Sequence, residues 1–395
     1  MRIFPLLILV TLLAFPAAAV IIDSGDGTGN TSAPADDPGW DNVGKRGGTT
    51  AVYVDNGWVV TARHVGIGSV VLDGVLYDPI TDSRVIIEHN ASKNADLAVF
   101  QLEEPWPPLP ALEIRASEPE VGDDVVMVGH GRDRGPATSW NPPPPDPTIY
   151  GYDWALTRTV RWGTNVVASV GEDIASGDDL TRSFSTDFTP ISSGGTVHEA
   201  MAANGDSGGA VFVDDGTYWE LGGVIYTIAQ YDGQDVDDAL YGNLTCAADL
   251  SYYRDQILDI VYPCSNGIDD DGDGWVDHPD DPGCAAADDS SELDPAVPCD
   301  DGLDNDDDGW NDFPDDPGCR YVTSVVENPQ CDDGFDNDHD DRIDWDGGGV
   351  GAPDPLCIGK PWLNRESNVS CGLGFELVLL LPALLWWRRQ RFARV

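Results

Sequence analysis

The chain is poor in basic residues, in cysteine over its first part, and in long apolar runs. Its 395 residues include 21 Lys or Arg against 70 Asp or Glu, which gives a formal net charge of −49. A surface this acidic repels nucleic acid and anionic lipid, so neither is an expected partner. No cysteine lies between Met1 and Thr245, so no disulfide can crosslink that part of the chain.

Two apolar runs occur, and both are short for a membrane span. The first, Leu6–Phe15, follows Arg2 and precedes Ala17-Ala18-Ala19. This order is typical of a signal peptide, which we place at residues 1–19. An uncleaved anchor helix is the alternative interpretation. The signal peptide predicts a protein that works outside the cytoplasm, where disulfides persist.

The second run, Leu377–Trp387, lies in residues 358–395, which we interpret as a linker and a sorting or anchor segment with a short apolar helix. Cys371 precedes the run, and Arg388 and Arg389 follow it. The order resembles the tripartite C-terminal sorting signals of some Gram-negative bacteria, particularly myxobacteria. The resemblance implies that sorting machinery cleaves or attaches the chain at Cys371, on a secreted or outer-membrane-associated protein. A plain short membrane anchor is the alternative.

Residues 20–262 carry short β-rich segments between Gly, Pro and Asp turns, which predict an all-β barrel or sandwich. The spacing of Tyr253–Val261 predicts one terminal helix. Four consecutive prolines within residues 140–147 predict an extended surface loop. The predicted strands are Thr50–Val54, Gly57–Ala62, Val85–Glu88, Leu97–Leu102, Asp124–Gly129, Ala210–Val213 and Leu221–Thr227.

The string Gly205-Asp206-Ser207-Gly208-Gly209 has the composition that a nucleophilic serine needs. Flanking glycines allow a tight turn that exposes the hydroxyl, and the N–H groups of Gly205 and Ser207 can face a developing oxyanion. Such turns also occur by chance, so the string needs partners.

Two partners precede it in the chain. His64 ends the string Trp58-Val59-Val60-Thr61-Ala62-Arg63-His64, where a histidine at a strand end can act as a general base. Asp96 opens the apolar strand Asp96-Leu97-Ala98-Val99, where an imidazole N–H would satisfy its carboxylate. A surface histidine and a strand-initiating turn residue are the plain alternatives for each residue alone.

Together these strings resemble the trypsin/chymotrypsin family of serine proteases over roughly residues 40–262. The resemblance implies two six-stranded β-barrels, with His64 and Asp96 from the first barrel and Ser207 from the second. It implies an endopeptidase whose triad is His64, Asp96 and Ser207, and whose oxyanion hole uses Gly205 and Ser207. No cofactor is then needed for catalysis, and the substrate is a protein or peptide.

The specificity pocket departs from the trypsin pattern. By alignment with the family, Met201 stands where trypsin-like members place an aspartate, Tyr226 where serine is usual, and Ile228 where glycine is common. These residues argue against a preference for Lys or Arg and favour small or medium apolar side chains.

A new N-terminal amine commonly pairs with the aspartate before the nucleophile in this family, here Asp206. Cleavage after residue 19 would leave Val20-Ile21-Ile22, at a distance from His64 close to the family's own. We therefore hypothesise that signal peptidase creates the activating terminus. The alternative is that these residues are only an extended lead-in.

Residues 263–357 form three similar acidic units, 264–284, 299–319 and 331–357, with the shared pattern D-x-D-x-D-G-x-x-D. Between Pro263 and Ser370 the chain carries 31 Asp or Glu and 4 Lys or Arg. Oxygen ligands at alternate positions suit a hard cation such as Ca²⁺. The candidate structural ligands are Asp269, Asp271, Asp273 and Asp277 in the first unit, Asp304, Asp306, Asp308 and Asp312 in the second, and Asp336, Asp338, Asp340 and Asp344 in the third, where Asp341 replaces the glycine.

The units resemble thrombospondin type 3 calcium repeats. They have too few apolar residues to fold by burial, so calcium and one disulfide per unit would hold them. Pairing within each unit, Cys264–Cys284, Cys299–Cys319 and Cys331–Cys357, is the simplest of the connectivities open to six cysteines. A disordered acidic spacer is the alternative. Cys246 is left as a buried thiol or the partner of an unrecognised group.

The expected function is therefore a secreted or surface-attached serine endopeptidase, with an oligomeric state that the sequence does not define. One rival is a non-catalytic, calcium-dependent adhesion or structural protein. An α/β esterase is disfavoured, because its triad runs in the order Ser, Asp, His whereas the order here is His, Asp, Ser.

Overall fold

The computed structural model describes residues 20–349 and 351–366. The predicted signal peptide, the predicted C-terminal apolar helix and Cys371 lie outside the described residues. The chain divides into two compact units, one ending at Val261 and one beginning at Tyr262. Each unit is described by itself below.

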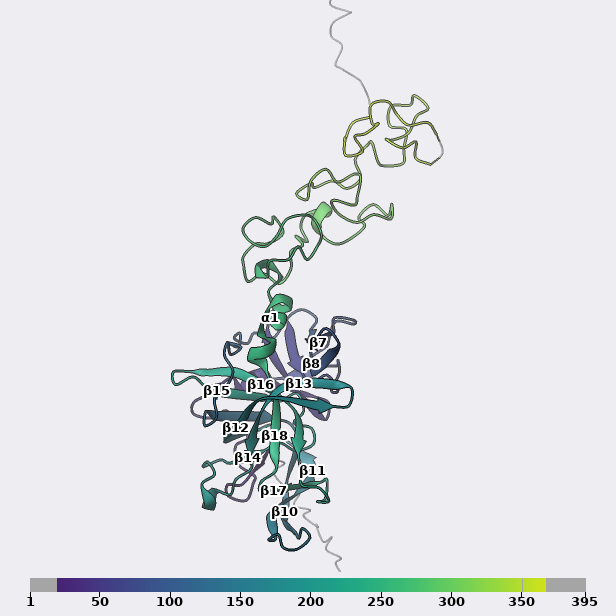
Figure 1. Ribbon diagram of the computed structural model, residues 1–395. Helices are drawn as coiled ribbons and strands as arrows, with labels where there is room; N and C mark the ends of the chain where they lie inside the picture. The colour runs from purple at the N-terminus through teal and green to yellow at the C-terminus, as the bar shows by residue number, and fades with distance from the viewer. Residues whose placement is uncertain (1–19, 350, 367–395) are drawn as a thin grey trace, which may run out of the picture. The chain divides into compact units, whose positions relative to one another are not determined.

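The first unit is rich in strands (Figure 1). Its N-terminal half contains a seven-stranded antiparallel sheet. The sheet is followed by a closed barrel of six strands. In spatial order the sheet contains β6 (Val75–Tyr77), β5 (Val70–Leu72), β2 (Val43–Arg46), β3 (Thr49–Asp55), β4 (Trp58–Thr61), β8 (Lys93–Gln101) and β7 (Val85–Asn90). The barrel contains β12 (Arg161–Ser176), β13 (Asp179–Asp187), β18 (Leu244–Asp249), β16 (Trp219–Ala229), β15 (Ala210–Asp214) and β9 (Asp124–Gly129).

The expectation of two six-stranded barrels holds for one of them. The other half is a seven-stranded sheet whose edge strands β6 and β7 pair only with β5 and β8 respectively. β6 has three residues, two of them exposed. A strand this short and this exposed offers few groups for pairing across a closure.

Two small sheets and one helix complete the first unit. β1 (Ile21–Ile22) pairs with β14 (Ala200–Met201). β10 (Arg132–Trp140), β11 (Ile149–Arg158) and β17 (Asp238–Leu240) form a three-stranded sheet, in which the proline-rich loop joins β10 to β11. The predicted terminal helix is present as α1 (Leu250–Val261). Short 3-10 turns occur at Trp40–Asn42 and Ile191–Ser193 in the first unit, and at Pro263–Ser265 and Pro298–Asp300 in the second. None of the helices in the described ranges has the length and apolar character to cross a membrane.

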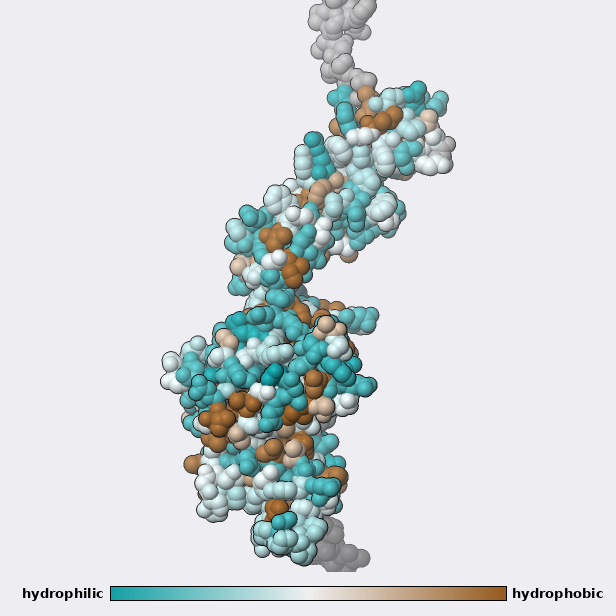
Figure 2. Space-filling view, viewed as in Figure 1, coloured by the Kyte–Doolittle hydropathy of each residue, from teal (hydrophilic) through white to brown (hydrophobic). Residues whose placement is uncertain are grey.

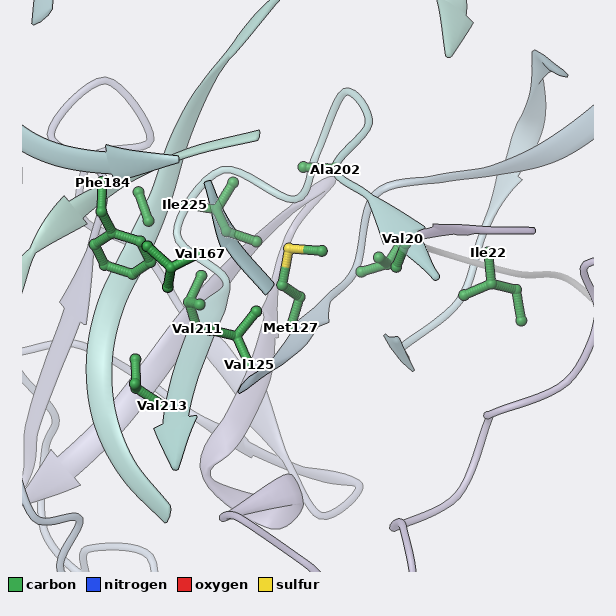
Figure 3. Close-up of a cluster of buried hydrophobic side chains, with 12 residues drawn as sticks. Val20, Ile22, Val125, Met127, Val167, Phe184, Ala202, Val211, Val213 and Ile225 are labelled. Atoms are coloured by element: carbon green, nitrogen blue, oxygen red, sulfur yellow. The ribbon is translucent and has the colours of Figure 1, made fainter. Parts of the chain in front are cut away.

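The barrel core explains why the N-terminal segment enters the fold where it does. Alternating residues of β9 and β15, including Val125, Met127 and Val211, point into the barrel and are buried. Val20 and Ile22 belong to the same cluster, as Figure 3 shows. Burial of aliphatic side chains of this size stabilises a fold by about 1.5–3 kcal/mol each. The apolar lead-in is thus anchored beside the barrel rather than lying free.

The second unit has almost no regular structure and is held by crosslinks. The three predicted disulfides are all present, at Cys264–Cys284, Cys299–Cys319 and Cys331–Cys357. Figure 2 shows a mainly hydrophilic surface over this unit, on which apolar side chains such as Trp275, Leu303, Trp310 and Phe335 are exposed. These side chains bury too little surface to make a core.

Candidate active site

The turn around Ser207 is fixed by glycines and by two threonines of the seven-stranded sheet. Gly208 has a φ of +86°, and a Cβ on it would lie 1.9 Å from the carbonyl oxygen of Thr50 and 2.2 Å from the hydroxyl of Thr61. No other residue fits that space. The N–H of Thr50 donates to the carbonyl of Ser207 at 3.0 Å. The Ser207 turn therefore packs directly on the ends of β3 and β4.

Two N–H groups of this turn are left without a protein acceptor. The N–H groups of Asp206, Gly208 and Gly209 donate to main-chain carbonyls. Those of Gly205 and Ser207 donate to no group of the described residues. They are the pair that the sequence assigned to an oxyanion hole. Free, fixed donors on either side of a nucleophile are what a developing oxyanion requires.

His64 and Asp96 are in direct contact. The Nδ1 of His64 lies 2.8 Å from Oδ2 and 3.1 Å from Oδ1 of Asp96. The main-chain N–H of His64 also donates to Oδ1, at 3.0 Å. The side chain of Asp96 is 3% exposed and that of His64 is 48% exposed. The carboxylate is thus buried behind a ring whose far nitrogen can face a ligand.

The electrostatics of this pair suit a base that becomes charged. The hydrogen bond that His64 donates to Asp96, opposed by burial, raises the pKa of His64 above its ordinary value. The main-chain N–H of Asp96, in β8, donates to the hydroxyl of Thr181 in β13 at 2.9 Å. No feature of the sequence predicted this contact between the sheet and the barrel.

Ser207 and His64 do not form a hydrogen bond in the described structure. Their main chains are nevertheless tied to the same place. The hydroxyl of Thr61 lies against Gly208 of the Ser207 turn. His64 follows Thr61 by three residues, so the Cα atoms of Thr61 and His64 are at most roughly 11 Å apart. Hydrogen bonds of catalytic serines are often long without substrate and tighten in the complex. The structure therefore pairs two members of the predicted triad and brings the third close.

A cavity of about 320 Å³ adjoins Ser207. Its lining includes Ala202, Tyr226 and Ile228, two of which were predicted. Met201 is not part of this lining. It is fully buried in a cluster with Ile21 and Phe188, because β1 pairs with β14 and covers it. Its place at the specificity pocket stays a prediction.

The other side of the cavity comes from segments that sequence reasoning did not connect with it. Trp154 of β11 contributes, as do Val236 and Asp237 just before β17. Asp237 is paired with Arg132 of β10 at 3.2 Å. The three-stranded sheet therefore supplies one wall of the cavity.

Asp206 is fully buried and its carboxylate accepts three main-chain hydrogen bonds. The donors are Ala203 at 2.8 Å, Gly131 at 2.7 Å, and Val20. Burial raises the pKa of Asp206 to about 7, against the effect of these donors. A Cβ on Gly131 would lie 2.3 Å from the carboxylate. The segment before β10 is therefore shaped around this side chain.

Arg158 lies beside the candidate oxyanion hole, without any signal in the sequence. Its Nη2 donates to the side-chain oxygen of Asn204 at 2.6 Å, and its Nη1 donates to the Asn204 carbonyl. Asn204 directly precedes Gly205, so this clamp holds the N-terminal side of the turn.

Cys246 in β18 is buried and forms no disulfide with any cysteine of the described residues. Burial raises the pKa of its thiol to about 11.

In the second unit, the first three predicted aspartate ligands lie close together in each of the two loops that keep the glycine of the pattern. One oxygen from each of Asp269, Asp271 and Asp273 lies within 4.8 Å of the others, and Asp304, Asp306 and Asp308 repeat the arrangement. Asp336, Asp338 and Asp340 occupy the corresponding positions of the third loop. There Asp341 takes the place of glycine with a φ of +66°, and its N–H donates to Asp336 at 2.9 Å. The glycine replacement thus preserves the turn.

The fourth predicted ligand of each loop accepts hydrogen bonds that close the loop. Both oxygens of Asp277 accept main-chain N–H groups from residues 266–267, at 2.9 Å. Asp312 and Asp344 accept the corresponding N–H groups in the second and third loops. These aspartates hold the two ends of each loop together, and their role as calcium ligands stays a prediction.

A buried glutamate follows each repeat and was missed. Glu292, Glu327 and Glu366 are at most 3% exposed, and each accepts a main-chain N–H from the loop before it. Two of them stand eight residues after the second cysteine of their repeat and the third stands nine after it. This regular spacing is the feature of the sequence from which the three glutamates could have been predicted.

The comparison with protein families supports the first unit alone. Residues 48–224 match the family model described as a trypsin-like peptidase domain. The match spans less than half of the chain and includes His64, Asp96 and Ser207. No curated protein matches the chain. The match supports a serine-protease type of function, and with it a protein substrate.

Proposed function

We propose that the protein is a secreted or surface-attached serine endopeptidase that uses His64, Asp96 and Ser207. The observation that carries the proposal is the Ser207 turn, with two unused N–H groups next to the His64–Asp96 pair. In the first step His64 accepts the proton of Ser207 while its Oγ attacks the peptide carbonyl carbon. Asp96 orients the ring and stabilises the imidazolium.

The negative charge that develops on the carbonyl oxygen is met by the N–H groups of Gly205 and Ser207. Loss of one such donor costs about 3 kcal/mol in comparable sites. His64 then returns its proton to the leaving amine, and an acyl-enzyme remains on Ser207. A water molecule, deprotonated by His64, hydrolyses the ester and restores the serine.

The cavity beside Ser207 accepts the side chain that precedes the cleaved bond. Ile228 narrows it, and Trp154 and Val236 make the opposite wall apolar. Medium-sized apolar side chains fit this lining best. The charge of Asp237 is offset by Arg132, so it gives little attraction to a basic side chain.

Activation follows from the contact between Val20 and Asp206. Cleavage after residue 19 would convert the Val20 amide donor into an ammonium group, which supplies a charge partner to a fully buried carboxylate. Export and activation would then be one event. N-terminal sequencing of the active enzyme tests this, and a first residue well beyond Ile22 contradicts it.

The acidic repeats bind calcium in this proposal and act as a spacer, and the C-terminal segment addresses the protein to the surface of a Gram-negative cell. The three-aspartate groups of the first two loops support the calcium sites. Fractionation of cells that express the chain, with and without residues 371–395, tests the location.

The central experiment is labelling of the purified protein with a fluorophosphonate, which reacts only with an activated serine. We expect one label, on Ser207, and none on Ser207→Ala. Ser193→Ala, which changes an exposed serine of another turn, should label normally. Absence of label in the properly processed, calcium-loaded protein would favour the non-catalytic adhesion alternative.

A further inference from the structure

The residue after the first cysteine of a repeat is a serine in the first repeat and an aspartate in the two repeats that follow. It is Ser265 in the first repeat, Asp300 in the second and Asp332 in the third. Only the second and third repeats have a repeat before them. The aspartate is therefore present where a neighbour precedes it.

In the structure, Asp332 lies against the preceding repeat. One carboxylate oxygen from each of Asp308, Asp316 and Asp332 lies within 4.8 Å of the other two. Asp308 comes from the second loop and Asp316 from the turn before Cys319. No arginine or lysine of the described residues pairs with these three groups. Three carboxylates at this distance repel each other unless a cation lies between them.

The junction also contains buried oxygens that no donor satisfies. Asp316 is 1% exposed and Glu327 is 3% exposed, and Oε1 of Glu327 has no hydrogen-bond partner. The indole N–H of Trp345 donates to Oδ1 of Asp332 at 2.7 Å, which fixes that side chain. Oδ2 of Asp332 is buried without a partner. A buried polar oxygen without a donor is costly, and a metal ion is an alternative partner.

The junction between the first and second repeats also contains buried carboxylates, at the positions that correspond by sequence. Asp273 and Asp281 stand 35 residues before Asp308 and Asp316. They are 6% and 3% exposed, and Oδ2 of each has no hydrogen-bond partner. Asp300 is 3% exposed, and its Oδ2 lies 3.2 Å from the position of a Cβ on Gly283, in the turn of the first repeat.

We propose that each junction is a second kind of calcium site, which links one repeat to the next. Its carboxylates are Asp308, Asp316 and Asp332 at one junction, and Asp273, Asp281 and Asp300 at the other. Hard oxygen ligands of this charge suit Ca²⁺. Asp308 and Asp273 each serve a loop and a junction, so the two kinds of site share a bridging ligand. The inference rests on the proposal that the repeats bind calcium.

The test is the number of calcium ions bound by the full processed chain, measured by titration calorimetry and equilibrium dialysis. Asp332→Asn keeps the oxygen that Trp345 needs and removes one charge. We expect it to bind one ion fewer, or to bind one at least about tenfold more weakly. Asp300→Asn should lose a different ion. Asp315→Asn, an exposed neighbour of Asp316, should equal the wild type.

Asp304→Asn, in a loop, separates the two proposals. If it loses an ion while Asp332→Asn and Asp300→Asn bind as the wild type does, the junction proposal is overturned and the loop proposal stands. If the wild type binds no calcium, both are overturned. Should Asp332→Asn fail to fold, terbium luminescence decides. Trp345 excitation should sensitise an ion at this junction in the wild type, and unchanged emission in Trp345→Phe refutes the site.

Discussion

The first unit buries its aliphatic and aromatic side chains, whereas the second unit buries carboxylates. Phe184, Phe212 and Tyr253 are among the largest fully buried side chains of the first unit. In the second, apart from cysteines, the buried groups are mainly Asp and Glu, such as Asp316 and Glu366. The first unit gains its stability from burial of apolar area. The second must gain it from disulfides and from neutralisation of its charge.

This difference in what is buried suits the two units to different functions. A barrel with a packed core holds side chains to the small tolerances that catalysis needs. Loops that depend on ions respond to their surroundings but cannot position a nucleophile in this way. Changes in one unit should therefore leave the other unaffected, and the predictions below test this.

The largest effect is expected for Ser207→Ala. Removal of the nucleophile should lower kcat by about 10⁵–10⁶-fold against a peptide substrate, with only residual turnover. Calcium binding by the repeats should not change. Circular dichroism of the variant should equal that of the wild type, and a loss of calcium stoichiometry would contradict the independence of the two units.

Asp96→Asn should lower kcat by roughly 10⁴-fold, because the amide holds the wrong tautomer of His64. Asp96 raises the pKa of His64, and only the neutral ring can accept a proton. In the wild type, kcat/KM should therefore fall with decreasing pH through a midpoint above the ordinary imidazole value of about 6.5. In the variant that midpoint should move to lower pH. An unchanged midpoint argues against the pairing.

Ile228→Gly should widen the cavity and shift the preference from medium to large side chains. One methylene in such a pocket is worth about 1–3 kcal/mol, so we expect the ratio of kcat/KM for Phe over Val substrates to rise at least about tenfold. Leu156→Gly, an exposed residue of β11, is a control for loss of a side chain at the surface. If this ratio is the same in both variants, Ile228 does not line the specificity pocket.

The smallest effect on turnover is expected from calcium removal. A chelator together with a reductant should unfold the repeats, since each disulfide contributes about 2–4 kcal/mol. Residues 20–261, the described part of the first unit, contain no disulfide, so kcat on a short peptide should change less than about twofold. Limited proteolysis should cut residues 262–366 and spare the first unit. A parallel loss of activity would show that the units are coupled.

Much of the first unit could be predicted because its apolar segments have a strong pattern. All seven predicted strands are present, and the three strings around His64, Asp96 and Ser207 mark the residues of the site. The hairpins of β10 with β11 and β12 with β13 were missed. Their residues are largely polar and half-exposed, so no alternation of apolar residues marks them.

Contacts between segments that are far apart in the chain could not be predicted. Met201 was assigned to the pocket by counting from Ser207, but counting cannot show that Ile21 pairs with it. Asp277 was assigned as a ligand from its spacing, which does not show that its carboxylate accepts N–H groups ten and eleven residues earlier. The disulfides were predictable because the repeat itself pairs the cysteines.

The position of Cys246 sets the order in which this chain must mature. Seven other cysteines follow it in sequence, and six of them form the three disulfides of the repeats. A thiol exposed among them could form a wrong crosslink. In β18 it is enclosed by the barrel and holds its proton tightly. Closure of the barrel before oxidation of the repeats thus protects the correct pairing. A chain whose barrel forms late should accumulate scrambled species that contain this cysteine.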